Sequence, residues 1–400
     1  MKDTVYDGYR AYDYLEKNVD YRGFEFAEQL NRVEPYAVEV TAEEEERARR
    51  LIRESIVISL HDHPHVYPES ADELVEYSQV GRGHLAYEGL AHSGLDVVFD
   101  NMFDGTTIIN SKYGWKWIEV IHDIGMRTCD IDHQDYLLVG RSVADLIRAH
   151  ETGRMALVLT LEASTPIENE LERLEILYGL GVRMMGITYS EGNQLGCGLR
   201  EPNDGGLTMF GRQAVQRMNR IGMAIDVSHS GDQTCLDTID VSDRPVFISH
   251  AGARSLWKTP RLKPDSVLRA CAAKGGLIGI EAAPHTTITE NNPEHSIESF
   301  MEHFEYCVDL VGIDHVTFGP DTLYGDHVAL HRAFRSHLSI GQAHANVDYT
   351  EVEYVRGLEN PSECFPNIVR WLVKHNYSDD EIEKVIGGNT LRVLGEVWAR

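Results

Sequence analysis

Eight short apolar runs recur along the chain, separated by stretches with the periodicity of helices. Continuous apolar strands that alternate with helices are typical of a parallel sheet covered on both faces. Eight such units predict an α/β fold of the closed (β/α)8 TIM barrel type, with an open doubly wound sheet as the competing architecture. The runs cover residues 57–61, 95–101, 156–162, 184–190, 223–229, 246–250, 276–282 and 316–321.

The end of each run carries a polar or ionisable residue, and this regularity favours the barrel. In a barrel, the carboxyl ends of all strands lie at one rim, where active sites are found, whereas in an open sheet only the ends at a switch point converge. The sequence therefore predicts a site assembled from many strands. The residues at these ends are His61 with His63, Asp100, Glu162, Tyr189, His229, His250, Glu281 and Asp321.

Two segments lie outside this repeating pattern. Residues 1–40 are acidic and rich in tyrosine, without clear periodicity, and we expect an N-terminal extension that wraps a larger body. Thr41 and Glu44 then form a capping-box sequence ahead of a helix, so we expect a single barrel domain over residues 41–400. The segment 324–361 is longer than a compact β/α connection, and we expect it to cover the rim or a subunit contact.

The composition excludes several classes of protein. A formal charge of −27 over 400 residues disfavours binding to nucleic acid or to an anionic membrane surface. No apolar run reaches the roughly 20 residues of a membrane helix, and with neither a signal sequence nor a lipid-anchor tail we expect a cytoplasmic protein. The six cysteines are far apart, which predicts reduced thiols. No glycine-rich phosphate-binding motif opens a helix, so nucleotide cofactors have no visible docking signal.

The first strand ends on an H-x-H motif, which is a good signal for a metal site. Alternate residues of an extended segment face the same side, so His61 and His63 can reach one ion while Asp62 points away. The alternative is a pair of histidines that are only hydrogen-bonded inside the barrel. His65 follows Pro64 and is expected to leave the strand line, where it supports the ligands from outside or has no role.

Three further strand ends complete a set of nitrogen and oxygen ligands. Glu162, His229 and His250 join the H-x-H pair to give four histidines and one glutamate, a set that suits zinc. Five ligands exceed the number that one tetrahedral ion takes. We therefore predict two zinc ions, with Glu162 as a bridge and a shared position left for water or hydroxide.

Two charged residues near the same rim are candidates for chemistry and recognition. Asp321, at the end of the last strand, can accept a proton from an activated water and pass it to a leaving group, although a loop cap is the simpler alternative. Two nearby cations would keep this carboxylate ionised at neutral pH. Arg261, in the loop eleven positions after His250 (261 − 250), can hold a substrate carboxylate, or it is a solvated loop arginine.

With these residues in place, the chain resembles the membrane (renal) dipeptidase family, which are zinc peptidases of the amidohydrolase-type barrel superfamily. The resemblance runs from about Leu51 to Trp398 and consists of several ordered motifs at similar spacing. These motifs are VISLHDHP, LTLEAS, LGVRMMGITYSEGNQLG, GLTMFGRQAVQRMNRIGMAIDVSHS, PVFISHAGARSL with RLKPDSVLR, GIDHVTFGPD and GGNTLRVLGEVW.

The resemblance implies a role for each candidate residue. It implies a binuclear zinc site in which Glu162 bridges, with His61 and His63 at one ion and His229 and His250 at the other. It also implies that Asp321 is the proton shuttle and that Arg261 clamps the terminal carboxylate of the substrate. A homodimer is implied as well.

This chain departs from the pattern of the family at two positions. The family has H-x-D where this chain has His61, Asp62 and His63, so a neutral imidazole replaces an anionic ligand; H-x-H is common in the wider superfamily. Tyr189 stands where the family places a histidine that steadies the oxyanion. A tyrosine hydroxyl can donate the same hydrogen bond, so we expect Tyr189 to contact the substrate and to act in catalysis.

Three functions follow from these features. The first is a zinc-dependent dipeptidase that cleaves the amide of a small, carboxylate-bearing substrate with a hydroxide shared by the two ions. The second keeps the metals and changes the substrate to an N-acyl amino acid, a cyclic amide or a lactone, because of Tyr189 and His63. The third is a metal-binding barrel without catalysis, against which the presence of Asp321 argues.

Overall fold

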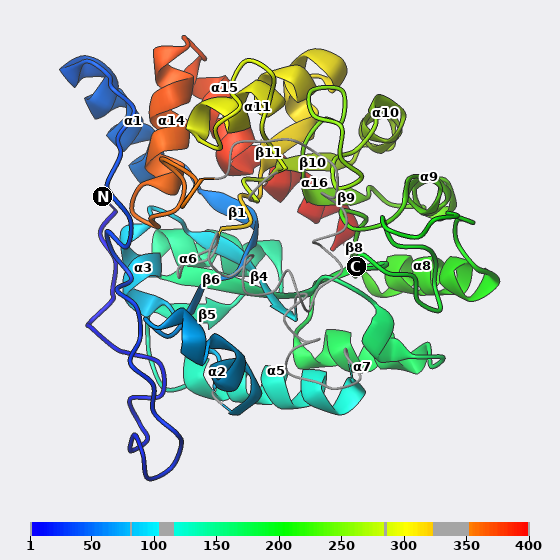
Figure 1. Ribbon diagram of the computed structural model, residues 1–400, viewed down its shortest axis with the longest axis horizontal. Coiled ribbons are helices and arrows are strands. Elements are labelled where there is room, and N and C mark those ends of the chain that lie inside the picture. Colours follow the sequence, from blue (N-terminus) through cyan, green and yellow to red (C-terminus); the bar gives the residue numbers. More distant parts are fainter. Residues whose placement is uncertain (1, 81, 104–115, 284–285, 323–351, 399–400) are drawn as a thin grey trace.

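The protein folds as a barrel of eight parallel strands with helices around it (Figure 1). The computed structural model describes residues 2–80, 82–103, 116–283, 286–322 and 352–398. The predicted insertion over 324–361 lies outside the described residues as far as residue 351. In sheet order the strands are β1 (Ile58–Asp62), β4 (Val97–Phe103), β6 (Met155–Leu161), β7 (Met184–Gly186), β8 (Ala224–Asp226), β9 (Phe247–Ala251), β10 (Leu277–Ile280) and β11 (Val316–Phe318).

The barrel closes where the last strand returns to the first. Every neighbouring pair from β1 to β11 is parallel. Beyond the end of β11, the backbone N–H of Asp321 donates to the carbonyl of His61 at 3.2 Å. The predicted (β/α)8 barrel is thereby confirmed, and each of the eight predicted runs overlaps one of its strands.

Three strands were not predicted. β5 (Leu137–Val139) pairs with β6 but is not one of the eight barrel strands. β2 (His65–Val66) forms a two-stranded antiparallel sheet with β3 (His84–Leu85). All three are only two or three residues long, so they show no apolar periodicity that could be recognised.

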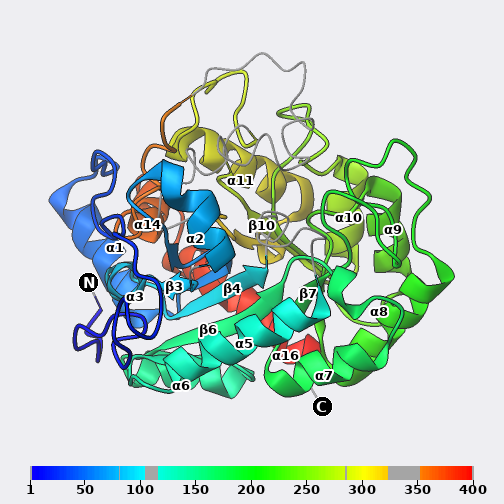
Figure 2. The same ribbon diagram turned by 60° about the horizontal axis from the view of Figure 1, so that its bottom comes forward.

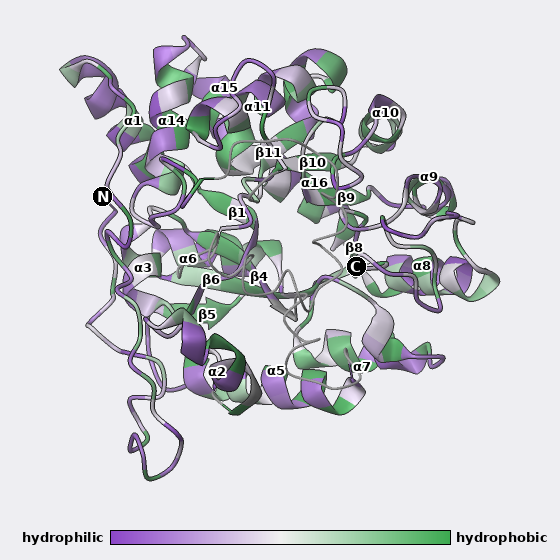
Figure 3. Ribbon diagram, in the orientation of Figure 1, coloured by the Kyte–Doolittle hydropathy of each residue, from purple (hydrophilic) through white to green (hydrophobic). Residues whose placement is uncertain are grey.

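Helices cover the outside of the barrel and carry both hydrophobic and hydrophilic residues, as Figures 2 and 3 show. The longer helices are α1 (Ala42–Glu54), α5 (Trp117–Ile131), α6 (Val143–Glu151), α7 (Glu172–Leu180), α8 (Met209–Ile221), α9 (Asp232–Val241), α10 (Asp265–Ala273), α11 (Ile297–Val311), α14 (Cys364–Lys374) and α16 (Asn389–Val397). The shorter ones are α2 (Leu74–Val80), α3 (Tyr87–His92), α15 (Asp379–Glu383), the 3-10 turns η1 (Ala71–Glu73), η2 (Thr165–Ile167) and η3 (Ile313–His315), and the π-helical turn η4 (Lys384–Gly388).

Helix α8 illustrates how sequence determines these helices. Gly211, Ala214, Val215 and Met218 are buried at the three- and four-residue spacing of one helix face. The Thr208 side chain caps the first turn by accepting from the N–H of Gly211 at 2.9 Å. Burial of this face orients the helix against the strands and leaves the charged face in solvent.

The caps of two helices differ in kind. The predicted capping box of α1 is present, with the Glu44 N–H donating to Thr41 Oγ1 at 3.3 Å and the Thr41 N–H donating to Glu44 at 2.7 Å. Pro264 is the N-cap of α10. Its ψ of 154° is extended, and the helix begins one residue later.

One end of the barrel is closed by a C-terminal helix. Seven of the eight barrel strands contribute their first or second residue to a buried apolar cluster, which also includes residues of α16. Phe247 of β9 and Val393 and Leu394 of α16 belong to this cluster. The cluster excludes water from the amino ends of the strands. The opposite rim, formed by the carboxyl ends, is therefore the end at which polar groups gather.

None of the helices in the described part of the chain has the length and apolar content needed to span a bilayer.

Candidate metal centre

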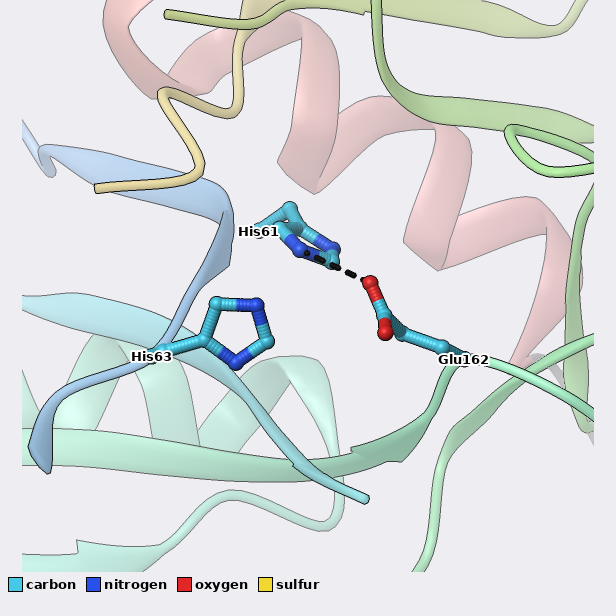
Figure 4. A group of neighbouring side chains, drawn as sticks. All are labelled: His61, His63 and Glu162. Carbon is cyan, nitrogen blue, oxygen red and sulfur yellow. Dashed lines mark ion pairs between the residues drawn. The ribbon is translucent and has the colours of Figure 1, made fainter. Parts of the chain in front are cut away.

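Side chains from five strand ends converge at the carboxyl rim of the barrel. Glu162 occupies the middle of the group, because its Oε1 lies 3.3 Å from His61 Nε2, 3.6 Å from His229 Nε2 and 3.4 Å from His250 Nε2. His61 and Glu162 point toward each other, with His63 beside them (Figure 4). All of these side chains are buried, so one central oxygen faces three imidazoles in a site that is largely shielded from water.

These residues form three overlapping groups of ligand atoms. The atoms of each group lie within 4.8 Å of one another. The groups are His61 with His63 and Glu162, His61 with His250 and Asp321, and Glu162 with His229 and His250. The structure thus brings together all five residues that the sequence suggested as metal ligands, and it adds Asp321 to them.

Asp321 lies against the H-x-H pair. Its Oδ1 is 3.4 Å from His61 Nε2 and 3.2 Å from His63 Nε2. Burial opposes ionisation, but the close contacts with the two histidines outweigh it and hold the pKa of Asp321 well below its usual value. The residue has a φ of 58°, a left-handed conformation that few non-glycine residues adopt. Such strain is found where surrounding structure and function require it.

The histidines are held in the neutral form that can bind a metal. Burial lowers the pKa of His61, and it lowers the pKa of His229 and of His250 well below the usual value. A neutral imidazole has one nitrogen lone pair available to a cation. His61 Nε2 makes no well-aligned hydrogen bond to any described residue, although it is buried between two carboxylates.

Hydrogen bonds behind the ligands orient the imidazole rings. His63 Nδ1 lies 3.2 Å from the carbonyl of Asn101, and the Asn101 carboxamide contacts His61 Nδ1. His250 Nδ1 lies 2.8 Å from Ser249 Oγ. Partners of this kind on the far ring nitrogen fix the orientation of metal-bound histidines. The donor chemistry, the neutral imidazoles and these outer contacts all fit a zinc-type cation at this site.

A chain of hydroxyl groups continues from His250 to a buried carboxylate. Ser249 Oγ lies 3.2 Å from Ser228 Oγ, which donates to Asp226 Oδ1 at 2.7 Å. The same oxygen accepts from the N–H of Ser249 at 2.7 Å. Asp226 therefore fixes the backbone and side chain just before His250. This role could not be predicted from the sequence, because Asp226 lies inside an apolar run.

Tyr189 lies beside the second histidine pair. Its ring stacks on that of His229, with centroids 4.2 Å apart and an interplanar angle of 21°. Only 7% of the residue is exposed. The aromatic ring thus covers one face of a candidate ligand at the edge of the metal centre.

Arg261 is buried at the rim rather than solvated. Its Nη1 donates to the carbonyl of His250 at 3.0 Å, and its Nη2 forms an ion pair with Glu281. Glu281 is fully buried at the end of β10, and burial raises the pKa of its carboxyl to about 7 despite the arginine. Glu281 was predicted only as a polar strand end, and its pairing with Arg261 was not predicted.

Two other polar residues next to the H-x-H pair, Asp62 and His65, lie outside the ligand groups. Asp62 points away from His61, as expected, and contacts the hydroxyls of Ser59 and Thr322 at 3.1 Å each. His65 Nε2 lies 3.3 Å from Asp100 Oδ1 and 2.9 Å from Arg127 Nη2. The strand end at Asp100 is therefore engaged in a buried ion pair with Arg127 and belongs to none of the three ligand groups.

Comparison with known proteins places the chain among relatives of known family. The profile of the family described as Membrane dipeptidase (Peptidase family M19) matches residues 45–330 and 336–399. The chain is 30% identical over 288 residues to the Dipeptidase aclJ of Aspergillus oryzae, which covers 71% of this chain and 60% of that protein. It is 28% identical over 346 residues to the Dipeptidase verJ of Clonostachys rogersoniana, with 83% and 80% covered. The chain spans 56% to 60% of the length of the first two curated relatives.

Solved structures share the fold. An amidohydrolase from Pseudomonas aeruginosa superposes with a TM-score of 0.73 at 25% identity, covering 88% of this chain and 99% of that one. A metallo peptidase from Rhodobacter sphaeroides, liganded with a phosphinate mimic of the dipeptide L-Ala-D-Ala, gives a TM-score of 0.65 at 19% identity over 86% and 100% of the two chains. Because the profile matches most of its length, this chain belongs to the membrane dipeptidase family.

Proposed function

We propose that this protein is a metal-dependent hydrolase that cleaves the amide bond of a small substrate with a free carboxylate, such as a dipeptide. The observation that carries the proposal is the position of Asp321, whose carboxylate lies within 3.4 Å of His61 and His63, beside the ligand groups that share Glu162. A site that only bound metal would not need an additional ionised carboxylate here. The curated relatives named dipeptidases support the same substrate class.

We assign two ions to the ligand groups. His61, His63 and Glu162 would hold one, and Glu162, His229 and His250 the other, so that Glu162 is shared between them. Zinc suits this set of histidine nitrogens and carboxylate oxygens. When bound, such ions lower the pKa of water and polarise a carbonyl group. The burial of the site strengthens these electrostatic effects.

Three residues of the chain would act on the substrate. Asp321 is ionised at neutral pH, so it can accept the proton of the attacking water and return it to the departing amine. The Arg261 guanidinium, fixed by the His250 carbonyl, would hold the substrate carboxylate. The Tyr189 hydroxyl would donate a hydrogen bond to the carbonyl oxygen as negative charge develops on it.

A second candidate substrate class uses the same residues. Tyr189 covers His229 with a large ring at the edge of the site, and this ring would accept an apolar acyl group as readily as an amino acid side chain. N-acyl amino acids, cyclic amides and lactones are therefore alternatives. They differ from dipeptides in lacking a free amino group on the acyl side or a free carboxylate.

Metal analysis and a substrate panel test the proposal. We expect about two zinc ions per chain by elemental analysis, and hydrolysis of dipeptides in preference to N-acyl amino acids and lactones. Asp321→Asn should keep the metal and lower kcat by about 100-fold or more, since general acid–base catalysis contributes that much. Asp314→Asn is the matched control, because Asp314 pairs with Lys384 at the surface at 2.7 Å. Full turnover in Asp321→Asn would contradict the assigned role.

A further inference from the structure

Asn101 is a buried polar residue on a strand that contributes no metal ligand. It lies in β4, beside the end of β1, and is only 5% exposed. Its backbone carbonyl lies 3.2 Å from His63 Nδ1, and its carboxamide contacts both His61 Nδ1 and Thr160 Oγ1. One residue thus contacts the far ring nitrogen of both members of the H-x-H pair.

The contact with His63 determines which of its nitrogens carries hydrogen. A carbonyl oxygen can only accept, so His63 must carry its hydrogen on Nδ1 and donate it to Asn101. In the neutral imidazole, Nε2 is then the atom with a free lone pair. This is the atom that faces Asp321 and the ligand group. The backbone of Asn101 therefore prepares His63 to bind a cation through Nε2.

The contact with His61 depends on the orientation of the Asn101 carboxamide. Its oxygen and nitrogen occupy nearly equivalent positions, and a half-turn exchanges them. With nitrogen toward His61, the imidazole accepts at Nδ1 and carries hydrogen on Nε2, where it faces Glu162 and Asp321 at 3.3 and 3.4 Å. With oxygen toward His61, the hydrogen moves to Nδ1, and the Nε2 lone pair becomes available to a cation.

Thr160 can accommodate the second orientation. Its hydroxyl donates to the carbonyl of Asp100 at 2.9 Å, so its oxygen can accept a hydrogen from an amide nitrogen. Its Oγ1 lies 2.7 Å from the end of the Asn101 carboxamide that faces it. The half-turned carboxamide would then donate to Thr160 and accept from His61. Each of the three contacts, from His61 to Asn101, from Asn101 to Thr160 and from Thr160 to the Asp100 carbonyl, would then have one donor and one acceptor.

We propose that Asn101 is a positioning residue for the metal centre. Its backbone carbonyl sets the tautomer of His63. Its carboxamide sets the tautomer of His61, because the carboxamide oxygen turns to His61 when a cation binds. This inference rests on the proposed metal-dependent function. Asn101 is buried and contacts both histidines, so its expected action is through them. The sequence pattern around it, an ordinary apolar strand, contains no motif for such a role.

Zinc affinity of side-chain variants tests the proposal directly. Asn101→Leu removes the carboxamide at similar volume, and we expect zinc binding to weaken by about 10- to 100-fold, as is usual when such a partner is lost. Asn101→Asp keeps an oxygen toward His61 and should bind zinc at least as tightly as the natural chain. The measurement is competition with a chromophoric zinc chelator, together with the number of ions bound. The absorption spectrum of the cobalt-loaded protein reports the ligand geometry.

Asn367→Leu is the matched control. Asn367 is fully buried and bonded to the backbone of Val38 at 3.0 Å and of Tyr36 at 2.9 Å, away from the metal centre. It should lose stability without losing zinc affinity. Equal zinc affinity in Asn101→Leu and the natural chain would overturn the proposal, as would an Asn101→Asp variant as weak as Asn101→Leu. If Asn101→Leu does not fold, the Asp variant alone decides between an oxygen and a nitrogen facing His61.

The failure of this inference can be distinguished from failure of the proposed function. A natural chain that binds no zinc or cobalt contradicts both. A natural chain that binds two ions and hydrolyses dipeptides, together with Asn101 variants of unchanged affinity, contradicts only the role of Asn101.

Discussion

Arg261 provides a sharp test of substrate recognition. If its guanidinium binds the substrate carboxylate, then Arg261→Met should remove the preference for a free carboxylate. The test compares a dipeptide with its C-terminal amide, which differs only in lacking the negative charge. The ratio of the two kcat/KM values measures how much the enzyme gains from the carboxylate.

The structure sets the size of the expected effect. Arg261 is only 6% exposed, and its donation to the His250 carbonyl at 3.0 Å holds the guanidinium in place before substrate arrives. A hydrogen bond to a charged partner contributes about 1.5 to 3 kcal/mol. At about 1.4 kcal/mol for each factor of ten, the natural chain should prefer the free carboxylate by about 10- to 150-fold. Arg261→Met should reduce this ratio to about one.

Glu281 complicates the single variant, because it would remain buried without its ion-pair partner. Removal of one member of a buried pair destabilises more than removal of both. The double variant Arg261→Met with Glu281→Gln therefore tests recognition in a better-folded protein. Both variants should show the same loss of preference, while melting temperature reports their stability.

Arg183→Met is the control for general damage. Arg183 is similarly buried and donates to the backbone carbonyls of Arg141 and Tyr178 at 2.8 Å each, but it precedes β7 at the opposite end of the barrel. It should leave the substrate ratio unchanged. An Arg261→Met variant that loses activity equally on the free and amidated dipeptides would refute the assignment of Arg261 as the carboxylate clamp.

Two other predictions follow from buried side chains. Tyr189→Phe should lower kcat by about 100-fold with unchanged metal content, because the ring that stacks on His229 remains while the hydroxyl donor is lost; unchanged kcat would exclude that donor. Burial lowers the pKa of His303 to about 4, and its Nδ1 accepts from the N–H of Ala253 at 3.0 Å. The folded state therefore keeps this imidazole neutral, whereas in the unfolded chain it gains a proton below about pH 6.5. Stability should fall as pH decreases from about 6.5 toward 4, and His303→Gln should remove about 2 kcal/mol of the difference between urea unfolding at pH 7 and at pH 4.5; an identical pH dependence in the variant would contradict this.

The ligand residues could be predicted from sequence because of how a parallel barrel is built. Each strand contributes a residue to the same rim, so a polar residue at a strand end is informative even when its partners lie far away in sequence. His61, Glu162 and His250 were predictable for this reason. The same logic identified Glu281 but could not pair it with Arg261, because loop positions carry no strand register.

The supporting residues could not be predicted in the same way. Asn101 and Asp226 lie within or at the end of apolar strands, where a polar residue has many possible reasons to occur. Their roles depend on which atoms they face, and that depends on the registers of β4 with β1 and of β8 with β9. Only the assembled barrel brings Asn101 to two histidines and Asp226 to the backbone before His250.

The H-x-H motif also becomes understandable once these contacts are considered together. Replacing a carboxylate ligand by the neutral imidazole of His63 removes a negative charge that would attract a cation. Asp321 compensates in part, because its ionised carboxylate lies 3.2 Å from His63 Nε2. The Asn101 carbonyl supplies the remaining requirement, an acceptor that keeps the Nε2 lone pair free. In the proposed metal centre, β4 and the end of β11 thus provide two partners that favour cation binding by a histidine at this position.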